Sequence, residues 1–194
     1  MTKWASMAAD TLNGLRVAIL VTDGVEEVEL TEPSKALEDA GADTKIVSPK
    51  RDKIQSWDFT DWGKSYAVDI PLNATRPEDF DALLLPGGMI NPDTLRTDAK
   101  AVKFVKSFLE ASKPVASICH GLWMLIEAEG VRGRKVTSWP SLKTDLKNAG
   151  AQWVDQDVVV DNGVVTSRGP DDMAAFNREM IRLLAQAKAK SHAA

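Results

Sequence analysis

Residues 114–130 read PVASICHGLWMLIEAEG, and this stretch passes from a strand to a helix within a few residues. The run PVASI at 114–118 is short, apolar and continuous, which is typical of a strand buried on both faces. The segment LWMLIEAEG that follows is predicted to be helical. Between them, Cys119-His120-Gly121 predicts a sharp turn. Its mechanics resemble those of a nucleophile elbow, although the usual G-x-S-x-G letters are absent.

The same alternation of apolar strands and helices extends along the chain in both directions. We predict strands over Arg16–Thr22, Thr44–Val47 and Asp81–Leu85, and helices from Glu26 to Gly41 and over Ala99–Leu109. Buried strands that alternate with helices indicate a mainly parallel sheet covered on both sides. The fold class is therefore α/β, a flavodoxin-like three-layer sandwich with its nucleophile elbow at Cys119.

Shorter features complete the prediction. The polar and aromatic residues 51–70 suggest a hairpin or excursion, and Asn162-Gly163 indicates a second hairpin within Val158–Ser167. We further expect a short strand over Val136–Ser138, a short helix over Ser141–Asn148 and a terminal helix over Pro170–Ala187. Residues 1–14 are expected to form a flexible extension, and residues 15–190 a single domain.

Composition excludes several function classes. The 194 residues include 44% hydrophobic and 27% charged residues, and the net charge is −4. An acidic chain is not expected to bind nucleic acid, which normally meets a basic face. No apolar run reaches the length of a membrane helix, and no secretory signal is apparent, so we expect no membrane contact. A single cysteine forms no intramolecular disulfide, which favours a reducing, cytoplasmic location.

Unusual residues follow three predicted strands, and active sites of parallel sheets form beyond such carboxyl ends. Cys119 follows one of them. At the start of a helix its thiol would have a lowered pKa, and the thiolate would be the nucleophile. The amide of His120 would point toward an oxyanion formed at the target of the sulfur. The alternative is that a lone cysteine is simply a small buried hydrophobic residue.

The other two strand ends supply candidate supporting groups. Gly87 and Gly88 would expose backbone amides that complete an oxyanion hole, or would form only a tight turn. Glu26 and Glu29 are three residues apart and would share a helical face. We favour Glu29 as a carboxyl that keeps its proton in a partly buried pocket and donates a hydrogen bond to the thiolate.

His120 is the remaining group that could transfer protons near neutral pH. Adjacent side chains at a tight turn are not expected to face each other, so we expect His120 to reach the pocket rather than the sulfur. Asp93, on the loop after Gly88, is the candidate acid that would orient its ring. The scattered acids and single cysteine do not form a metal-ligand pattern, and we predict neither a metal nor a cofactor.

Four segments together resemble the PfpI family of the ThiJ/PfpI superfamily. They are DGVEEVEL at 23–30, LLLPGG at 83–88, VASICHG at 115–121 and TSRGPDD at 166–172. The resemblance extends from about Leu15 to Ala185. It implies a nucleophile at Cys119 with His120 beside it, an acid at Glu29 in contact with the sulfur, and a further pocket acid at Glu26. Asp93 matches a partner acid of the histidine that some members supply from a neighbouring subunit.

The resemblance also implies a homodimer, or a hexamer built from dimers, and a choice of activities. Our leading hypothesis is a stress-protective protein deglycase or glyoxalase that hydrolyses methylglyoxal, other small aldehydes or their adducts on glycated proteins. A second hypothesis is an intracellular cysteine peptidase whose triad is completed across a subunit interface. A third, from another class, is an oxidative-stress cysteine sensor or chaperone without turnover.

Overall fold

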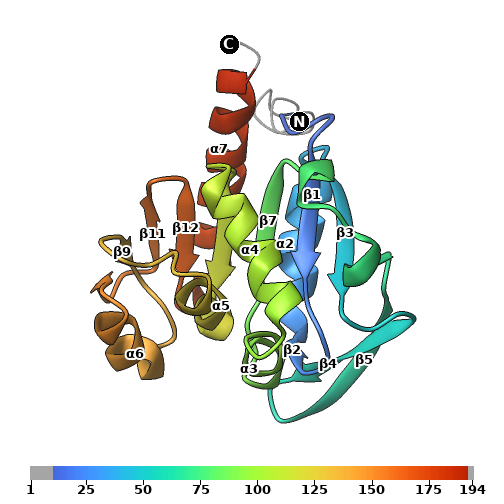
Figure 1. The fold of residues 1–194 in the computed structure, drawn as a ribbon, viewed down its shortest axis with the longest axis horizontal. Helices are drawn as coiled ribbons and strands as arrows, with labels where there is room; N and C mark the ends of the chain where they lie inside the picture. Colours follow the sequence, from blue (N-terminus) through green and yellow to red (C-terminus); the bar gives the residue numbers. More distant parts are fainter. Residues whose placement is uncertain (1–10, 192–194) are drawn as a thin grey trace, which may run out of the picture.

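The computed structural model describes residues 11–191, and a seven-stranded sheet forms its centre (Figure 1). The strands lie in the order β11-β12-β8-β7-β1-β3-β6, and all neighbours are parallel except β11 and β12. Their bounds are β1 Arg16–Leu20, β3 Asp43–Ser48, β6 Ile70–Pro71, β7 Ala82–Leu85, β8 Val115–Ile118, β11 Val158–Asp161 and β12 Val164–Ser167. The five strands β3, β1, β7, β8 and β12 have the flavodoxin-like order, which confirms the predicted fold.

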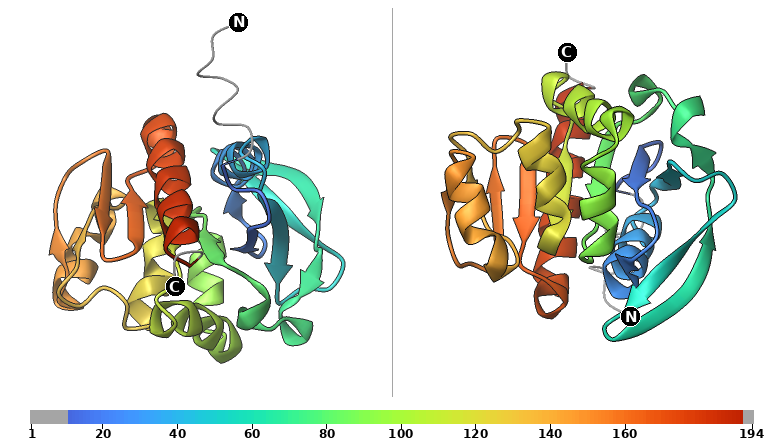
Figure 2. Two further views of the ribbon diagram at one scale, coloured as in Figure 1. Left: turned by 90° about the horizontal axis from the view of Figure 1, so that it is seen from above. Right: turned by 60° about the horizontal axis from the view of Figure 1, so that its bottom comes forward.

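Helices cover both faces of this sheet, as the view from above shows (Figure 2, left). The longer helices are α2 Glu27–Asp39 and α7 Met173–Ser191 on one face, and α4 Ala99–Glu110 and α5 Leu122–Glu127 on the other. The apolar run of β1 alternates between two cores. Ile19 packs in the cluster that contains Phe176, and Leu20 in the cluster that contains Phe104. Burial on both faces explains why this strand is continuously apolar.

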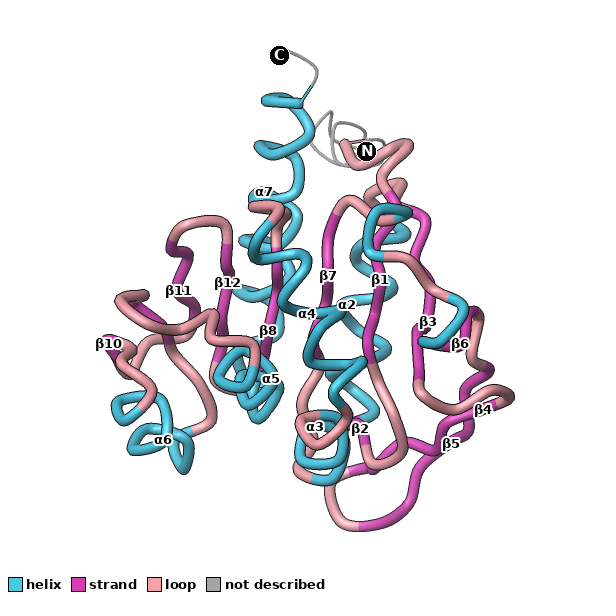
Figure 3. Tube along the Cα trace, viewed as in Figure 1, coloured by secondary structure: helices cyan, strands magenta, loops and turns pink. Residues whose placement is uncertain are grey.

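Several smaller elements lie at the carboxyl ends of the strands, among them β2 (Val25–Glu26), the end of the β4–β5 hairpin (Lys53–Asp58 and Asp61–Ala67) and α3 (Ile90–Leu95) (Figure 3). A three-stranded sheet contains β2, β4 and β5, so the hairpin expected within 51–70 is present. The remaining elements are β9 Lys135–Val136, β10 Gln152–Trp153, α6 Lys143–Asn148, and the 3-10 helices η1 Leu72–Ala74, η2 Pro77–Asp79, η3 Cys119–Gly121, η4 Pro140–Leu142 and η5 Pro170–Asp172.

Most element bounds shift by one or two residues from the sequence prediction, and three differences affect the description of the domain. The strand expected over Val136–Ser138 is instead Lys135–Val136, where it pairs with β10. The terminal helix continues past Ala187 to Ser191. Residues 1–10 of the expected extension lie outside the described residues, whereas residues 11–14 pack on the domain. Leu12 is fully buried, and its N–H donates to the carbonyl of Ala40 at 2.8 Å.

The architecture places the loops after β1, β7 and β8 side by side, because these three strands are neighbours in the sheet. Their carboxyl ends lie at the bottom of Figure 1, together with α3 and β2, and Figure 2 (right) tilts this end forward. No helix within residues 11–191 combines the length and the apolar character that a membrane crossing needs.

Candidate active site

Cys119 is held in a backbone conformation that few residues with a side chain adopt. Its φ is +60°, in the left-handed region, directly after β8 and at the first position of η3. Such a conformation costs of order 1–2 kcal/mol in a residue other than glycine. The third residue of the turn, Gly121, lies so close to the carbonyl of Leu85 that a Cβ there would collide with it. The predicted elbow is therefore present.

Gly87 and Gly88 form the wall that faces the elbow. A Cβ on Gly87 would lie 2.8 Å from the Cβ of Cys119, so only glycine permits this approach. Gly88 has a φ of +76°, and a Cβ there would collide with the carbonyl of Gly24. The two glycines thus let the loop after β7 contact both the nucleophile turn and the loop after β1.

Asn91 fixes this glycine loop, and the sequence analysis missed it. Its fully buried side chain accepts a hydrogen bond from the N–H of Thr22 at 2.7 Å. Its amide nitrogen donates to the carbonyls of Pro86 at 3.1 Å and Gly87 at 3.0 Å. One side chain therefore joins the ends of β1 and β7. Asn91 lies in α3, a helix of six residues that is too short to show a periodic pattern and was expected to be a loop, so nothing in the sequence pattern distinguished it.

Glu29 is the carboxyl that meets the sulfur. It is completely buried, and its Oε2 accepts the N–H of Gly87 at 2.9 Å, while Oε1 has no hydrogen-bond partner among the described protein atoms. Burial raises the pKa of Glu29 to about 8, against the lowering effect of its hydrogen bond to Cys119. The carboxyl therefore keeps its proton near neutral pH and is able to donate it to the sulfur.

The thiol of Cys119 differs from the expectation of a lowered pKa. Cys119 is only 6% exposed, and burial, followed by the negative charge of an ionised Glu29, raises its pKa. The backbone N–H groups of His120 and Gly88 act in the opposite direction. The turn that follows β8 is also a 3-10 helix of three residues, a short element with a weak dipole. The correction is that the site holds a neutral thiol near neutral pH, because burial and the neighbouring carboxyl both oppose ionisation of Cys119.

His120 contacts the sulfur directly, which corrects the expectation that neighbouring side chains would not face each other. The left-handed backbone at Cys119 turns both side chains to one side, and Sγ lies 3.2 Å from Nδ1 of His120. Nε2 lies 3.4 Å from Oγ of Ser141. The ring packs between Trp123 and Trp139, at centroid distances of 5.1 and 6.0 Å. Burial lowers the pKa of His120, so its imidazole is neutral at physiological pH.

Asp93 is not brought to His120 within its own chain. It lies exposed on α3, outside the pocket lining, and Ser141 takes the position next to Nε2. A contribution of Asp93 to the site of a neighbouring subunit remains a prediction.

The two neighbouring acids have separate roles. Glu26 lies in β2 rather than in the helix, yet it lines the pocket as predicted and accepts the N–H of Phe59 at 3.2 Å. Burial raises its pKa. Glu27 points away, to the hydroxyl of Ser56 at 2.6 Å, and this hydrogen bond lowers its pKa to about 2.

A pocket of about 850 Å³ opens above the sulfur. Besides Cys119, His120, Glu26, Glu29 and Gly88, its walls include residues to which the sequence analysis gave no role in the site, namely Trp57, Phe59, Met89, Trp139, Pro140, Ser141, Asp155, Arg168, Gly169, Pro170, Asp171 and Asp172. This size suits a small molecule or a side chain with a small adduct. The walls come from seven separate stretches of the chain, which explains why spacing in the sequence did not reveal them.

Donors for the negative charge of a reacting carbonyl oxygen are also present. The N–H groups of His120 and Gly88 act on the sulfur, and that of Gly88 also acts on Glu29, whereas the N–H of Gly87 donates to Glu29. Gly87 therefore serves to position the acid and not as a free oxyanion donor. Within residues 11–191, no group of three or more His, Cys, Asp or Glu residues has the arrangement of a metal site.

Comparison with known proteins gives consistent matches to one family. Residues 15–183 match the DJ-1/PfpI family. The chain is 42% identical over 169 residues to "Putative cysteine protease YraA" of Bacillus subtilis, which covers 87% of this chain and 98% of that protein. It is 44% identical over 174 residues to "Protein/nucleic acid deglycase 2" of Escherichia coli, at 87% and 97% coverage. The crystal structure of Drosophila melanogaster DJ-1beta superposes with a TM-score of 0.80 at 25% identity and covers 88% of this chain and 90% of that one.

Proposed function

The chain belongs to the DJ-1/PfpI family, and from that premise we propose that it is a stress-protective, cysteine-dependent hydrolase that converts methylglyoxal, or its adducts on proteins, to lactate. The observation that supports this most is the position of one sulfur between two proton-transfer groups. Glu29 hydrogen-bonds to Cys119 on one side, and Nδ1 of His120 lies 3.2 Å from Sγ on the other.

The first step is addition of the sulfur to the aldehyde carbon of methylglyoxal. As the C–S bond forms, the thiol proton passes to Nδ1 of the neutral His120, the carbonyl oxygen takes a proton from the carboxyl of Glu29, and the product is a hemithioacetal. While it develops negative charge, the carbonyl oxygen is stabilised by the N–H groups of Gly88 and His120. Transfer of the His120 proton back to Glu29 through solvent then resets both groups. A carboxyl with a pKa of about 8 is able to act as the acid in this step near neutral pH.

The second step moves a proton from the aldehyde carbon to the neighbouring ketone carbon through an enediol. The neutral ring of His120 takes the first proton and returns it to the second carbon, which leaves a lactoyl thioester on Cys119. Water then adds to the thioester, the C–S bond breaks, and lactate and the thiol are released. The oxidation of one carbon is balanced by the reduction of the other, so the reaction needs no redox cofactor.

For an adduct on a protein amine, the same sulfur attacks the carbon that carries the nitrogen. The C–N bond breaks as the C–S bond forms, the amine leaves with a proton from Glu29, and the remaining steps are unchanged. This series of reaction steps supports both deglycase and glyoxalase activity with a single set of residues, in agreement with the deglycase name of one relative.

The test is incubation of the protein with methylglyoxal and measurement of lactate. We expect turnover in the wild type and none in Cys119→Ala, with Glu27→Gln as a control because Glu27 points out of the pocket. Lactate formation that persists in Cys119→Ala would exclude the mechanism.

A peptidase is the second candidate, because another relative is named as a putative cysteine protease. In that case an acid from a partner subunit would orient His120, and Asp93 is the proposed acid. Assay of peptide cleavage across separated size fractions tests this candidate. Activity confined to the assembled fractions, and absent in Asp93→Asn, is expected if it is correct.

A redox sensor is the third candidate. Burial leaves Cys119 6% exposed and raises its pKa, which slows oxidation of the thiol as it slows attack on an aldehyde, so lactate formation decides between the two functions.

A further inference from the structure

The pocket above Cys119 has a strongly uneven distribution of charge. Besides Glu29, four carboxyl groups line it, and within the described residues Arg168 is the one lysine or arginine in that lining. The carboxyl groups are those of Glu26, Asp155, Asp171 and Asp172. The neutral ring of His120 adds no positive charge.

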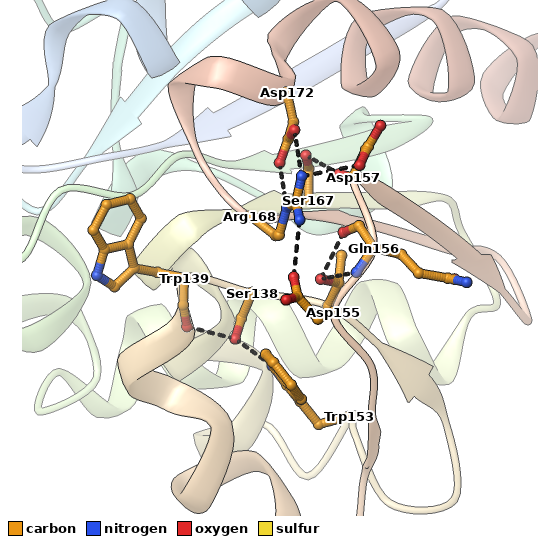
Figure 4. Close-up of polar contacts among 10 residues, drawn as sticks. Ser138, Trp139, Trp153, Asp155, Gln156, Asp157, Ser167, Arg168 and Asp172 are labelled. Carbon is orange, nitrogen blue, oxygen red and sulfur yellow. Dashed lines mark hydrogen bonds and ion pairs between the residues drawn. The ribbon is translucent and has the colours of Figure 1, made fainter.

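Arg168 is not available to an incoming anion, because its own neighbours occupy it (Figure 4). Its guanidinium donates two hydrogen bonds to Asp172, at 2.7 and 2.9 Å, one to Asp155 at 2.8 Å and one to Asp157 at 2.9 Å. These engage four of the five N–H groups that a guanidinium carries. We call Arg168, Asp155, Asp157 and Asp172 the Arg168 cluster. Its three carboxylates and one guanidinium give it a formal charge of −2.

Asp171 adds a carboxylate that is free to meet a ligand. It is exposed, lines the pocket, and makes no hydrogen bond or ion pair with any residue in the described part of the chain. It is thus distinct from the clamped carboxylates of the Arg168 cluster. An unpaired acid in a pocket wall is a direct partner for a cation.

Aromatic side chains line the same pocket. Trp57 and Phe59 come from the β4–β5 hairpin, and Trp139 comes from the segment before η4. Phe59 is 64% exposed and Trp139 is 43% exposed, so their rings are accessible to a ligand. Aromatic faces attract ammonium and guanidinium groups, and they also cover the apolar stems of lysine and arginine.

From these observations we propose that the pocket selects substrates by positive charge. It favours adducts carried by basic protein segments, rich in lysine and arginine, over the same adducts carried by polyanions such as nucleotides. Asp171 and the Arg168 cluster are the specificity-determining groups, with Trp139 and Phe59 beside them. The identity of the adduct rests on the proposed function, whereas the charge preference does not.

The charge preference is tested at the sulfur itself, without turnover. Two methanethiosulfonates of similar size are used, one with a trimethylammonium group and one with a sulfonate. The rate constants of the two reagents with Cys119 are expressed as a ratio, in which the thiolate fraction of Cys119 cancels. This ratio is divided by the same ratio for 2-mercaptoethanol, which corrects for the different intrinsic reactivity of the two reagents. We expect the normalised ratio to favour the cation by about tenfold or more at low salt and to shrink as salt is added.

Two variants that each remove one negative charge show whether the charge preference arises in the pocket. Asp171→Asn removes the free carboxylate from the pocket, and Glu110→Gln removes an exposed carboxylate at the end of α4, outside the pocket. We expect the normalised ratio to fall severalfold in Asp171→Asn and to remain unchanged in Glu110→Gln. A ratio near 1 in the wild type, or an equal fall in both variants, would overturn the proposal.

A substrate series separates this inference from the proposed function. Lactate release is compared for methylglyoxal-treated basic peptide, acidic peptide and guanosine monophosphate, each normalised to free methylglyoxal. We expect the basic peptide to be processed fastest. Equal rates, or a faster nucleotide, overturn the charge selection while the hydrolase function stands. No lactate from any substrate, with a cation-selective probe ratio, refutes the hydrolase function while the charge selection stands.

Discussion

At the scale of single residues, the protonated carboxyl of Glu29 connects chemistry to stability. The pKa of Glu29 is about 8 in the folded protein, whereas an unfolded glutamate has an ordinary value of 4.5. Between these values the folded state binds more protons than the unfolded state. The free energy of unfolding therefore falls as pH rises through this window, by up to ~1.4 kcal/mol per pH unit.

Glu29→Gln is expected to remove this dependence. Urea unfolding at pH 5 and pH 8 should show a marked loss of stability in the wild type at the higher pH and a smaller loss in the variant. Glu27 provides the control of opposite sign, because its pKa is lowered to about 2. Its stabilisation is present above pH 4.5 and is lost as pH falls toward 2, so Glu27→Gln should leave the decline between pH 5 and 8 intact. An unchanged slope in Glu29→Gln would contradict the buried, protonated carboxyl.

The left-handed backbone of Cys119 gives a second prediction at this scale. Both Cys119→Gly and Cys119→Ala remove the sulfur, but only glycine relieves the strain at a φ of +60°. We expect the glycine variant to be more stable than the alanine variant by ~1 kcal/mol. At Ser117, within β8, the order should reverse, because glycine weakens a strand. Thermal unfolding of the four variants measures both differences. The same order of stability at residues 117 and 119 would contradict the strain at Cys119.

At the scale of elements, Asn91 joins two strand ends, and its loss should affect stability and activity together. Asn91→Ala leaves the N–H of Thr22 and the carbonyls of Pro86 and Gly87 without their buried partner. We expect a destabilisation of ~1–3 kcal/mol, with loss of lactate formation as the Gly87–Gly88 loop shifts. Thr94→Ala, on the exposed side of the same helix, should be close to wild type in denaturant unfolding and in turnover.

The elements themselves were predictable because each leaves a local pattern. A strand buried on both faces must be continuously apolar, as in β1 and β7, and the Asn162-Gly163 pair marks the turn between β11 and β12. Glu26 was expected in the first helix but lies in β2, because the chain forms two residues of strand before α2 begins at Glu27. Acids in the first turn of a helix and acids just before it look alike in sequence.

The site was predictable only in part, because several of its properties belong to the assembled fold. Cys119, His120 and Glu29 follow strand ends, and parallel topology brings such positions together. The raised pKa of the thiol depends on how deeply the sulfur is buried, which spacing does not record. Arg168 meets Asp155 and Asp157 across a turn of the chain, so their cluster also became visible only in three dimensions.

At the scale of the whole molecule, a homodimer remains a prediction. Sedimentation of the purified chain should give a dimer mass, or a hexamer as a higher assembly. If Asp93 acts across the interface, specific activity should fall on dilution into the monomer range, and Asp93→Asn should reproduce that fall at high concentration. A monomer with full activity at every concentration would rule out a shared site.

The strained backbone at Cys119 also has an evolutionary consequence. Selection for chemistry holds a side chain where the backbone alone would prefer none. A duplicated gene copy freed from that selection should therefore drift toward glycine at this position, gaining robustness as it loses catalysis. Cysteine at 119 in a distant descendant would accordingly be a sign of continued use.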